Sequence, residues 1–164
     1  MNPFSIRFFS EQTSFYPKNK KQIKGWINEV IQNEGYTGNE LNIIFCNDEY
    51  LLSINKKFLN HDSYTDIITF DYTTKQTKPN RHSFSTKKST ISGELFISID
   101  RVKENTKKHN TTLAQELHRV IVHGVLHLCD YSDKSPASKR QMTNKEDYYL
   151  SLINFVSSGI PVKS

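Results

Sequence analysis

The chain has 164 residues, of which 35% are hydrophobic, and a formal net charge of +5. This length suits one domain with a buried core and is short for two, so we predict a single domain over residues 1–164. No apolar run approaches the ~20 residues that cross a bilayer, and the N-terminal residues lack the apolar core of a signal peptide. We therefore expect a cytoplasmic protein without membrane contact, whose cysteines, Cys46 and Cys129, are inert core thiols rather than a disulfide framework.

The first half of the chain alternates strand and helix patterns. A short strand is predicted over Ser5–Ser10, and apolar residues at helical spacing predict a helix over Lys18–Glu34. A second strand is predicted over Glu40–Cys46. Residues 47–48 then cap a helix whose apolar side is expected to consist of Tyr50, Leu51, Ile54 and Phe58.

The second half begins with strands and ends with helices. β-Branched and aromatic residues predict strands over Thr65–Tyr72 and Glu94–Ile99, joined by a long connection over about residues 73–91. Three helices are expected to follow: one capped by Asp100, a longer one capped by residues 111–112 and running to about Leu128, and one over Ser138–Ser157. This order predicts one α+β domain in which a small mixed sheet packs with helices.

The connection between the last two predicted strands is strongly basic. Residues 73–90 contain no acidic side chain, and their cations are Lys75, Lys78, Arg81, Lys87 and Lys88. Such a surface favours an anionic polymer, most simply RNA, as the partner. An ordinary solvated, lysine-rich surface is the alternative interpretation of the same charges.

The residues from His123 to Asp133 carry the strongest functional signal. Four residues turn a helix through about 400°, so His123 and His127 share one face about 6 Å apart along the axis. Asp133 follows beyond the expected helix end and can close the same site, whereas Asp130 is the rival third ligand. Three protein ligands with an open position are typical of a catalytic zinc. We therefore predict one Zn²⁺ held by His123, His127 and Asp133, at the C-terminal end of a core helix.

The spacing H-x3-H-x5-D also resembles the zinc motif of metzincin proteases, but the catalytic base of those enzymes is missing. Gly124 stands where a zinc protease carries the glutamate that takes a proton from metal-bound water. A metalloprotease is therefore disfavoured, and we expect Gly124 to permit close approach of a strand or substrate backbone. Met142 either places a thioether beneath the metal or packs in the core.

Three motifs, in the same order along the chain, resemble those of the YbeY family, bacterial metallo-endoribonucleases that act on single-stranded RNA in ribosomal RNA maturation. Residues 123–133, HGVLHLCDYSD, resemble the family motif HGxLHLxGYDH. Residues 55–70, NKKFLNHDSYTDIITF, resemble NxxFRxxDxPTDVLSF, and GELFI at residues 93–97 resembles the GDIxI strand. Met142 also stands where the family usually has methionine.

The resemblance implies a zincin-like fold with His123 and His127 as zinc ligands. It also implies metal-dependent cleavage of single-stranded RNA, with 16S rRNA 3′-end maturation and ribosome quality control as the setting. The implied partners are ribosomal RNA and the small ribosomal subunit, with no DNA specificity expected. Candidates for orienting the ligands are Asp66, Glu94 and His118; the alternatives are a strand cap, an exposed strand residue and a packed histidine, respectively.

The chain departs from the family pattern at four positions. Asp133 replaces the third histidine, and Tyr64 replaces a proline. Asp130 replaces a glycine and must adopt the turn that glycine allows. Leu59 replaces an arginine that the resemblance implies holds phosphate. Lys56, Lys57 or a lysine of the basic connection can substitute for that arginine. The loss of the arginine also favours a second hypothesis, a non-catalytic ribosome-assembly factor with a structural zinc.

Overall fold

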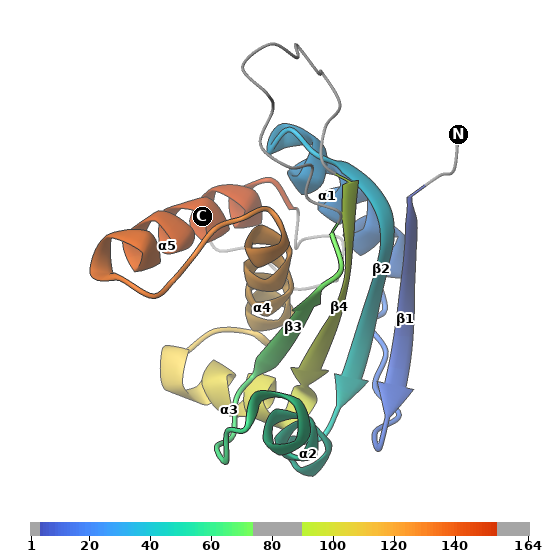
Figure 1. The fold of residues 1–164 in the computed structure, drawn as a ribbon, viewed down its shortest axis with the longest axis vertical. Helices are drawn as coiled ribbons and strands as arrows, with labels where there is room; N and C mark the ends of the chain where they lie inside the picture. Colours follow the sequence, from blue (N-terminus) through green and yellow to red (C-terminus); the bar gives the residue numbers. More distant parts are fainter. Residues whose placement is uncertain (1–3, 74–89, 154–164) are drawn as a thin grey trace.

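The computed structural model describes residues 4–73 and 90–153 and has an α+β architecture, as predicted (Figure 1). In chain order its elements are β1 (Ser5–Glu11), α1 (Lys20–Asn33), β2 (Thr37–Cys46), α2 (Asp48–Leu59), β3 (Ile67–Asp71), β4 (Thr90–Ser98), α3 (Ile99–His109), α4 (Leu113–Leu128) and α5 (Pro136–Ser151). The basic connection, with its five cationic side chains, falls outside the described residues.

The sheet is mixed, with strand order β1-β2-β4-β3. Strands β1, β2 and β4 are parallel, and β3 pairs antiparallel with β4, so that Thr69 lies opposite Leu95. Parallel neighbours need a crossover connection, which α1 supplies between β1 and β2. Strand β3 therefore forms one edge of the sheet, beside α4 (Figure 1).

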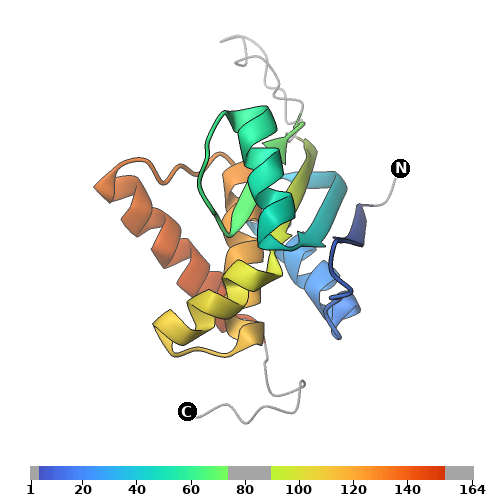
Figure 2. The same cartoon turned by 90° about the horizontal axis from the view of Figure 1, so that it is seen from below.

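The two faces of the sheet carry different helices. Alternating side chains of β2, among them Ile43 and Phe45, join the main core with residues of α1 and α4. On the other face, Cys46 and Ile68 pack against Leu51 of α2. Figure 2 shows α1 and α2 on opposite sides of the sheet. Burial raises the pKa of the Cys46 and Cys129 thiols to about 12, which agrees with their prediction as inert core thiols.

Helix α4 is the central helix of the domain. Thr112 caps it, as predicted, in a capping box with Gln115. Its core face consists of buried apolar residues, including Leu117, Val120, Ile121 and Val125. A Cβ at Gly124 would lie 2.8 Å from Cδ1 of Ile67 and 2.8 Å from Cδ2 of Leu95. The expected close approach of a strand at Gly124 is therefore confirmed.

Several boundaries differ from the sequence predictions. Ser98, not Asp100, caps α3: its side chain accepts a hydrogen bond from the backbone N–H of Arg101 at 3.2 Å. Asp100 instead accepts from the backbone N–H of Asp48 at 3.0 Å, because the strand ends one residue earlier than predicted and turns directly into α3. Helix α5 begins earlier than predicted, with Ser135 as its cap, and ends at Ser151; the predicted end at Ser157 lies outside the described residues.

Phe58 was predicted on the apolar side of α2, but 59% of it is exposed. Its ring packs in a T-shaped arrangement with Phe70, at 5.8 Å between ring centroids. Phe58 lies in the last turn of α2, after the buried residues Leu51, Ile54 and Asn55. Across residues 4–73 and 90–153, every helix is too short or too polar to cross a membrane.

Candidate metal centre

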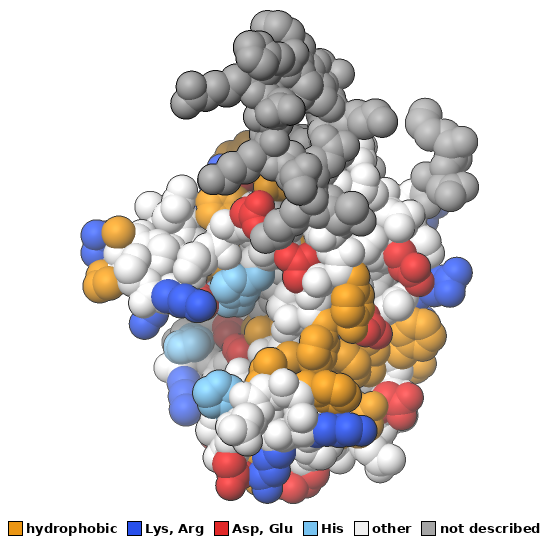
Figure 3. Space-filling model, viewed as in Figure 1, with side chains coloured by type: hydrophobic (Ala, Val, Ile, Leu, Met, Phe, Trp, Pro, Cys, Tyr) orange, Lys and Arg blue, Asp and Glu red, His pale blue; other side chains and the backbone are white. Residues whose placement is uncertain are grey.

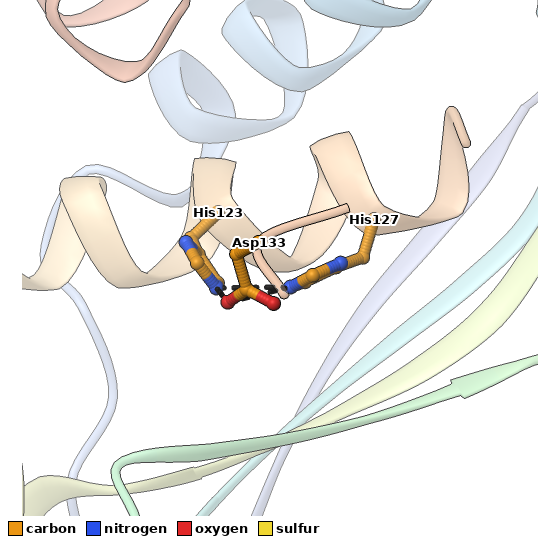
Figure 4. Close-up of side chains that lie close together, drawn as sticks. All are labelled: His123, His127 and Asp133. Carbon is orange, nitrogen blue, oxygen red and sulfur yellow. Dashed lines mark hydrogen bonds and ion pairs between the residues drawn. The ribbon is translucent and has the colours of Figure 1, made fainter. Parts of the chain in front are cut away.

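Three side chains from α4 and the segment after it converge on one point (Figure 4). The Nε2 atoms of His123 and His127 lie 3.0 Å apart. Oδ2 of Asp133 lies 3.3 Å from Nε2 of His123 and 3.5 Å from Nε2 of His127. Asp130 is not part of this group; it adopts φ +72°, the left-handed turn expected of a residue in place of glycine.

Each histidine is oriented through its other ring nitrogen. Nδ1 of His123 lies 2.6 Å from Oε2 of Glu146, and Nδ1 of His127 lies 2.9 Å from the carbonyl oxygen of Tyr131. A carboxylate and a carbonyl only accept hydrogen bonds, so we assign the ring proton to Nδ1 in both residues. In the neutral rings, both Nε2 lone pairs then face the shared point.

The donor set fits one metal ion. Ligands bound to zinc at about 2.0–2.2 Å in a tetrahedron lie about 3.3 Å from one another, close to the three donor distances of this group. Two imidazole lone pairs and a carboxylate oxygen would repel one another without a cation between them. The three residues can therefore hold one divalent cation and leave the fourth corner of the tetrahedron open.

Charges around the centre favour a cation. Burial lowers the pKa of His123, but its hydrogen bond with Glu146 and the charges of Glu146, Asp133 and Asp66 outweigh burial, so the pKa is raised overall. Burial raises the pKa of Asp66, and the charge of His123 opposes that effect. Asp66 is thus electrostatically coupled to His123, and its role in orienting the ligands stays a prediction.

A groove of about 560 Å³ opens beside the centre, and His123, His127 and Asp133 line one of its walls. Figure 3 shows histidine side chains beside a hollow in this face of the molecule. The opposite wall comes from α2, β3 and the loop between them, and its lining residues include Leu59, His61, Ser63, Thr65, Asp66 and Thr69.

Asn55 holds that loop in place and is itself buried, with 5% exposed. Its side-chain amide donates to the carbonyl oxygen of Ser63 at 2.9 Å. The backbone carbonyl oxygen of Asn55 accepts hydrogen bonds from the backbone N–H groups of Asn60 and His61. This clamp turns the chain back after α2 and brings Leu59 and His61 to the groove.

Two of the candidates for orienting the ligands lie elsewhere. Glu94 projects from the sheet face opposite α4, where it accepts a hydrogen bond from the Tyr72 hydroxyl at 2.9 Å. His118 is buried between α4 and α1: its ring lies 5.3 Å from that of Trp26, and its Nδ1 lies 2.6 Å from the carbonyl oxygen of Ala114.

The described lysine candidates lie outside the groove lining. Lys56 pairs with Asp62 at 3.3 Å, and Nζ of Lys57 lies 5.3 Å from the ring centroid of Phe58. Met142 is buried in the main core.

Sequence reasoning missed Glu146, which orients His123 from α5. One signal was available. Met142 and Glu146 are four residues apart in a helix, so they share a face, and a carboxylate on the same face as a core methionine indicates a partner inside the protein.

Fold and site together define a single-domain α+β protein with a candidate catalytic metal centre at the end of a core helix. The sequence model of a family described as endoribonuclease YbeY matches residues 6–154. An endoribonuclease YbeY from Cytophaga hutchinsonii is 46% identical, over 94% of this chain and 100% of the relative. Another, from Flavobacterium johnsoniae, is 40% identical, over 89% and 96%. The chain belongs to the YbeY family of endoribonucleases, as its motifs predicted.

The solved structures agree on the fold. The solution structure of TM1509 from Thermotoga maritima is similar, with a TM-score of 0.55 and 24% sequence identity. The similarity covers 89% of this chain and 87% of that protein.

Proposed function

We propose that this protein is a zinc-dependent endoribonuclease that cleaves single-stranded RNA, with one Zn²⁺ held by His123, His127 and Asp133. Family membership supports RNA as the substrate. The observation that carries the metal dependence is the convergence of two imidazole lone pairs and one carboxylate oxygen, all within 4.8 Å of one another. Maturation of the 16S rRNA 3′ end and ribosome quality control are the proposed setting, with the small ribosomal subunit as partner and the cytoplasm as compartment.

A zinc ion at this centre supplies a Lewis acid for a phosphoryl oxygen and lowers the pKa of a bound water. The residues of the chain prepare the site for it. The Nδ1–H groups of His123 and His127 donate to Glu146 and to the Tyr131 carbonyl, respectively. Their Nε2 lone pairs therefore remain available to a metal. Asp66 lines the same groove with a raised pKa, which suits its carboxylate to take up a proton during hydrolysis.

The groove also suits an RNA strand. Hydroxyl groups of Ser63, Thr65 and Thr69 line it and can bond to phosphate or ribose oxygens. Among the described lining residues there is no lysine or arginine, so a metal ion would be the cationic group available to phosphates there, with the His61 imidazole beside it. Leu59 adds an apolar surface against which an unpaired base can pack.

A ribosome-assembly factor with a structural zinc is the second candidate, and the observation that favours it is Leu59 in the groove in place of the family arginine. Structural zinc sites are closed by four protein ligands, however, whereas this group offers three. A metalloprotease is disfavoured further, since position 124 packs against Ile67 and Leu95 and has no room for a glutamate.

The test is cleavage of single-stranded ribosomal RNA by purified protein, with and without a chelator. His127→Ala should abolish both bound zinc, measured by elemental analysis, and cleavage. His109→Ala is the matched control: His109 is 58% exposed on α3 and pairs with Glu116, so both readouts should stay unchanged. Cleavage that survives the chelator and His127→Ala would contradict a zinc nuclease, and RNA binding without any cleavage would favour the assembly factor.

A further inference from the structure

Glu146 lies between the metal centre and a second charged group. Its carboxylate is buried, with 7% of the residue exposed. One oxygen, Oε2, lies 2.6 Å from Nδ1 of His123, and the other, Oε1, accepts from Nη1 of Arg119 at 2.9 Å. The guanidinium of Arg119 continues to Asp147, donating from Nη2 to Oδ1 at 2.7 Å. Both oxygens of Glu146 are thus occupied, one by a candidate metal ligand and one by a cation.

Packing alone does not require a carboxylate at this position. Burying a charge costs free energy unless it is fully paired, and well-packed apolar residues often replace buried ion pairs at no loss of stability. One turn earlier on the same face of α5, Met142 fills the core with an apolar side chain. The chemical role of Glu146 therefore lies in its contact with His123.

We propose that Glu146 is a positioning residue, which fixes the tautomer and ring orientation of His123 so that metal binding and the docking of α5 stabilise each other. The inference rests on the metal centre of the proposed function and extends it to a helix that contributes no ligand. The Nδ1 partner of His127 is a main-chain carbonyl, which a side-chain substitution leaves in place. The Nδ1 partner of His123 is the side chain of Glu146, so a substitution at position 146 removes it.

Helix α5 also has contacts that do not involve the metal ligands, and these keep Glu146 beside His123. Glu34, the C-cap residue of α1, accepts hydrogen bonds from Tyr149 and from Nζ of Lys145, the latter at 3.1 Å. The Trp26 indole donates to the carbonyl oxygen of Tyr149 at 2.8 Å. Binding linkage is reciprocal. If docked α5 raises the affinity for the metal by some factor, the bound metal must raise the equilibrium constant for docking of α5 by the same factor.

The discriminating pair of variants is Glu146→Gln and Asp147→Asn. Both remove one charge beside Arg119 without changing side-chain size, but only Glu146 touches His123. A glutamine that turns its NH₂ group toward His123 favours the tautomer with the proton on Nε2, which blocks the metal. A glutamine that turns its oxygen toward His123 instead faces the guanidinium donors of Arg119 with its own NH₂ donor, so neither group finds an acceptor.

The measurements are zinc affinity by competition with a chromophoric chelator, the d–d absorption of the cobalt-substituted protein, and the Tm of the metal-free form. For Glu146→Gln we expect zinc affinity to fall about 10- to 100-fold with an altered cobalt spectrum, the cost typical of losing a group that orients a ligand. The side chain of Asp147 is 59% exposed, so for Asp147→Asn we expect a zinc affinity within about twofold of the unaltered protein and an unchanged cobalt spectrum. Glu146→Asp, which keeps the charge on a shorter side chain, should fall between them.

The outcomes separate this inference from the proposed function. If the unaltered protein binds no zinc in the competition assay, the proposed function fails. If it binds zinc and Glu146→Gln binds as tightly as Asp147→Asn, only the positioning role is overturned, whatever happens to the Tm. Should Glu146→Gln fail to fold, Glu146→Asp decides: affinity and spectrum equal to those of the unaltered protein also overturn the inference.

Discussion

The two walls of the groove are built in different ways. On the α4 wall, each histidine has a second hydrogen bond that fixes its ring, to Glu146 or to the Tyr131 carbonyl. On the α2–β3 wall, the lining side chains Leu59 and His61 are exposed, and the buried amide of Asn55 holds the backbone that carries them. On one wall hydrogen bonds fix the side chains of the candidate metal ligands, and on the other a hydrogen bond fixes the backbone that carries exposed side chains.

Each wall also carries one departure from the family pattern. Asp133 changes the candidate ligand set on the α4 wall, and Leu59 changes the groove surface of the α2–β3 wall. If the walls are separable in function, substitutions on one should alter metal affinity alone and substitutions on the other should alter RNA handling alone.

The largest effect should follow from Asp133→Ala, which removes a donor from the metal centre. Loss of a ligand should cost more than the roughly 10- to 100-fold in affinity that loss of an orienting partner costs. Asp130→Gly is the control, because glycine adopts the left-handed turn at φ +72° without strain. Zinc titration of both variants checks the assignment, and loss of zinc from Asp130→Gly alone would reverse it.

Forcing the walls apart should have the next largest effect. A Cβ at Gly93 would lie 2.7 Å from the carbonyl oxygen of Phe70 and 2.9 Å from Cδ2 of Leu128, at the end of α4 that carries His127. Overpacking of this kind costs about 1–3 kcal/mol, so Gly93→Ala should lower the free energy of unfolding by that amount. Gly25→Ala, in α1 with nothing within 4 Å, should instead raise it. Urea unfolding compares the two.

Loosening only the substrate wall is the purpose of Asn55→Ala. The variant leaves the carbonyl oxygen of Ser63 without its amide donor, at a cost of about 1–3 kcal/mol. We expect a lower Tm and slower RNA cleavage with unchanged zinc affinity. The control is Ser53→Ala, since the Ser53 hydroxyl donates to the carbonyl of Tyr50 on the exposed side of the same helix. A change in zinc affinity for Asn55→Ala would show that the walls are coupled.

The smallest effect is expected from restoring the family arginine as Leu59→Arg. One added phosphate contact steepens the salt dependence of single-strand binding by about 0.7 and tightens binding roughly fivefold near 0.1 M salt. Leu152→Arg places the same charge at a site of similar exposure, 41% against 44%, outside the groove lining. Binding to fluorescent single-stranded RNA at several salt concentrations measures both. Equal gains in the two variants would assign the effect to net charge alone.

The predictable parts of this protein are those governed by local geometry. His123 and His127 converge because four residues bring a helix back to the same face, and Thr112 caps α4 because its side chain reaches the N–H of Gln115. Glu146 was not predictable in this way. Its approach to His123 depends on how α5 packs against α4, which no local spacing expresses.

Competition between similar local solutions explains the boundary errors. Ser98 and Asp100 are both good caps, and Ser98 is selected because it ends β4 in an extended conformation directly before the helix. The side chain of Asp100 instead accepts a hydrogen bond from the backbone N–H of Asp48, the first residue of the neighbouring helix α2. For Phe58, helical periodicity predicted a place on the apolar side of α2, but the residue stands in the last turn of the helix and is exposed.

Tyr131 gives the segment that carries Asp133 an anchor of its own. Its carbonyl oxygen accepts a hydrogen bond from His127, and its hydroxyl donates to Glu34, the C-cap residue of α1, at 2.5 Å. These two contacts hold the backbone after α4 without using the side chain of Asp133. A single codon change there exchanges a hard oxygen donor for a nitrogen or sulfur donor, so metal preference can evolve in this scaffold without rebuilding the fold.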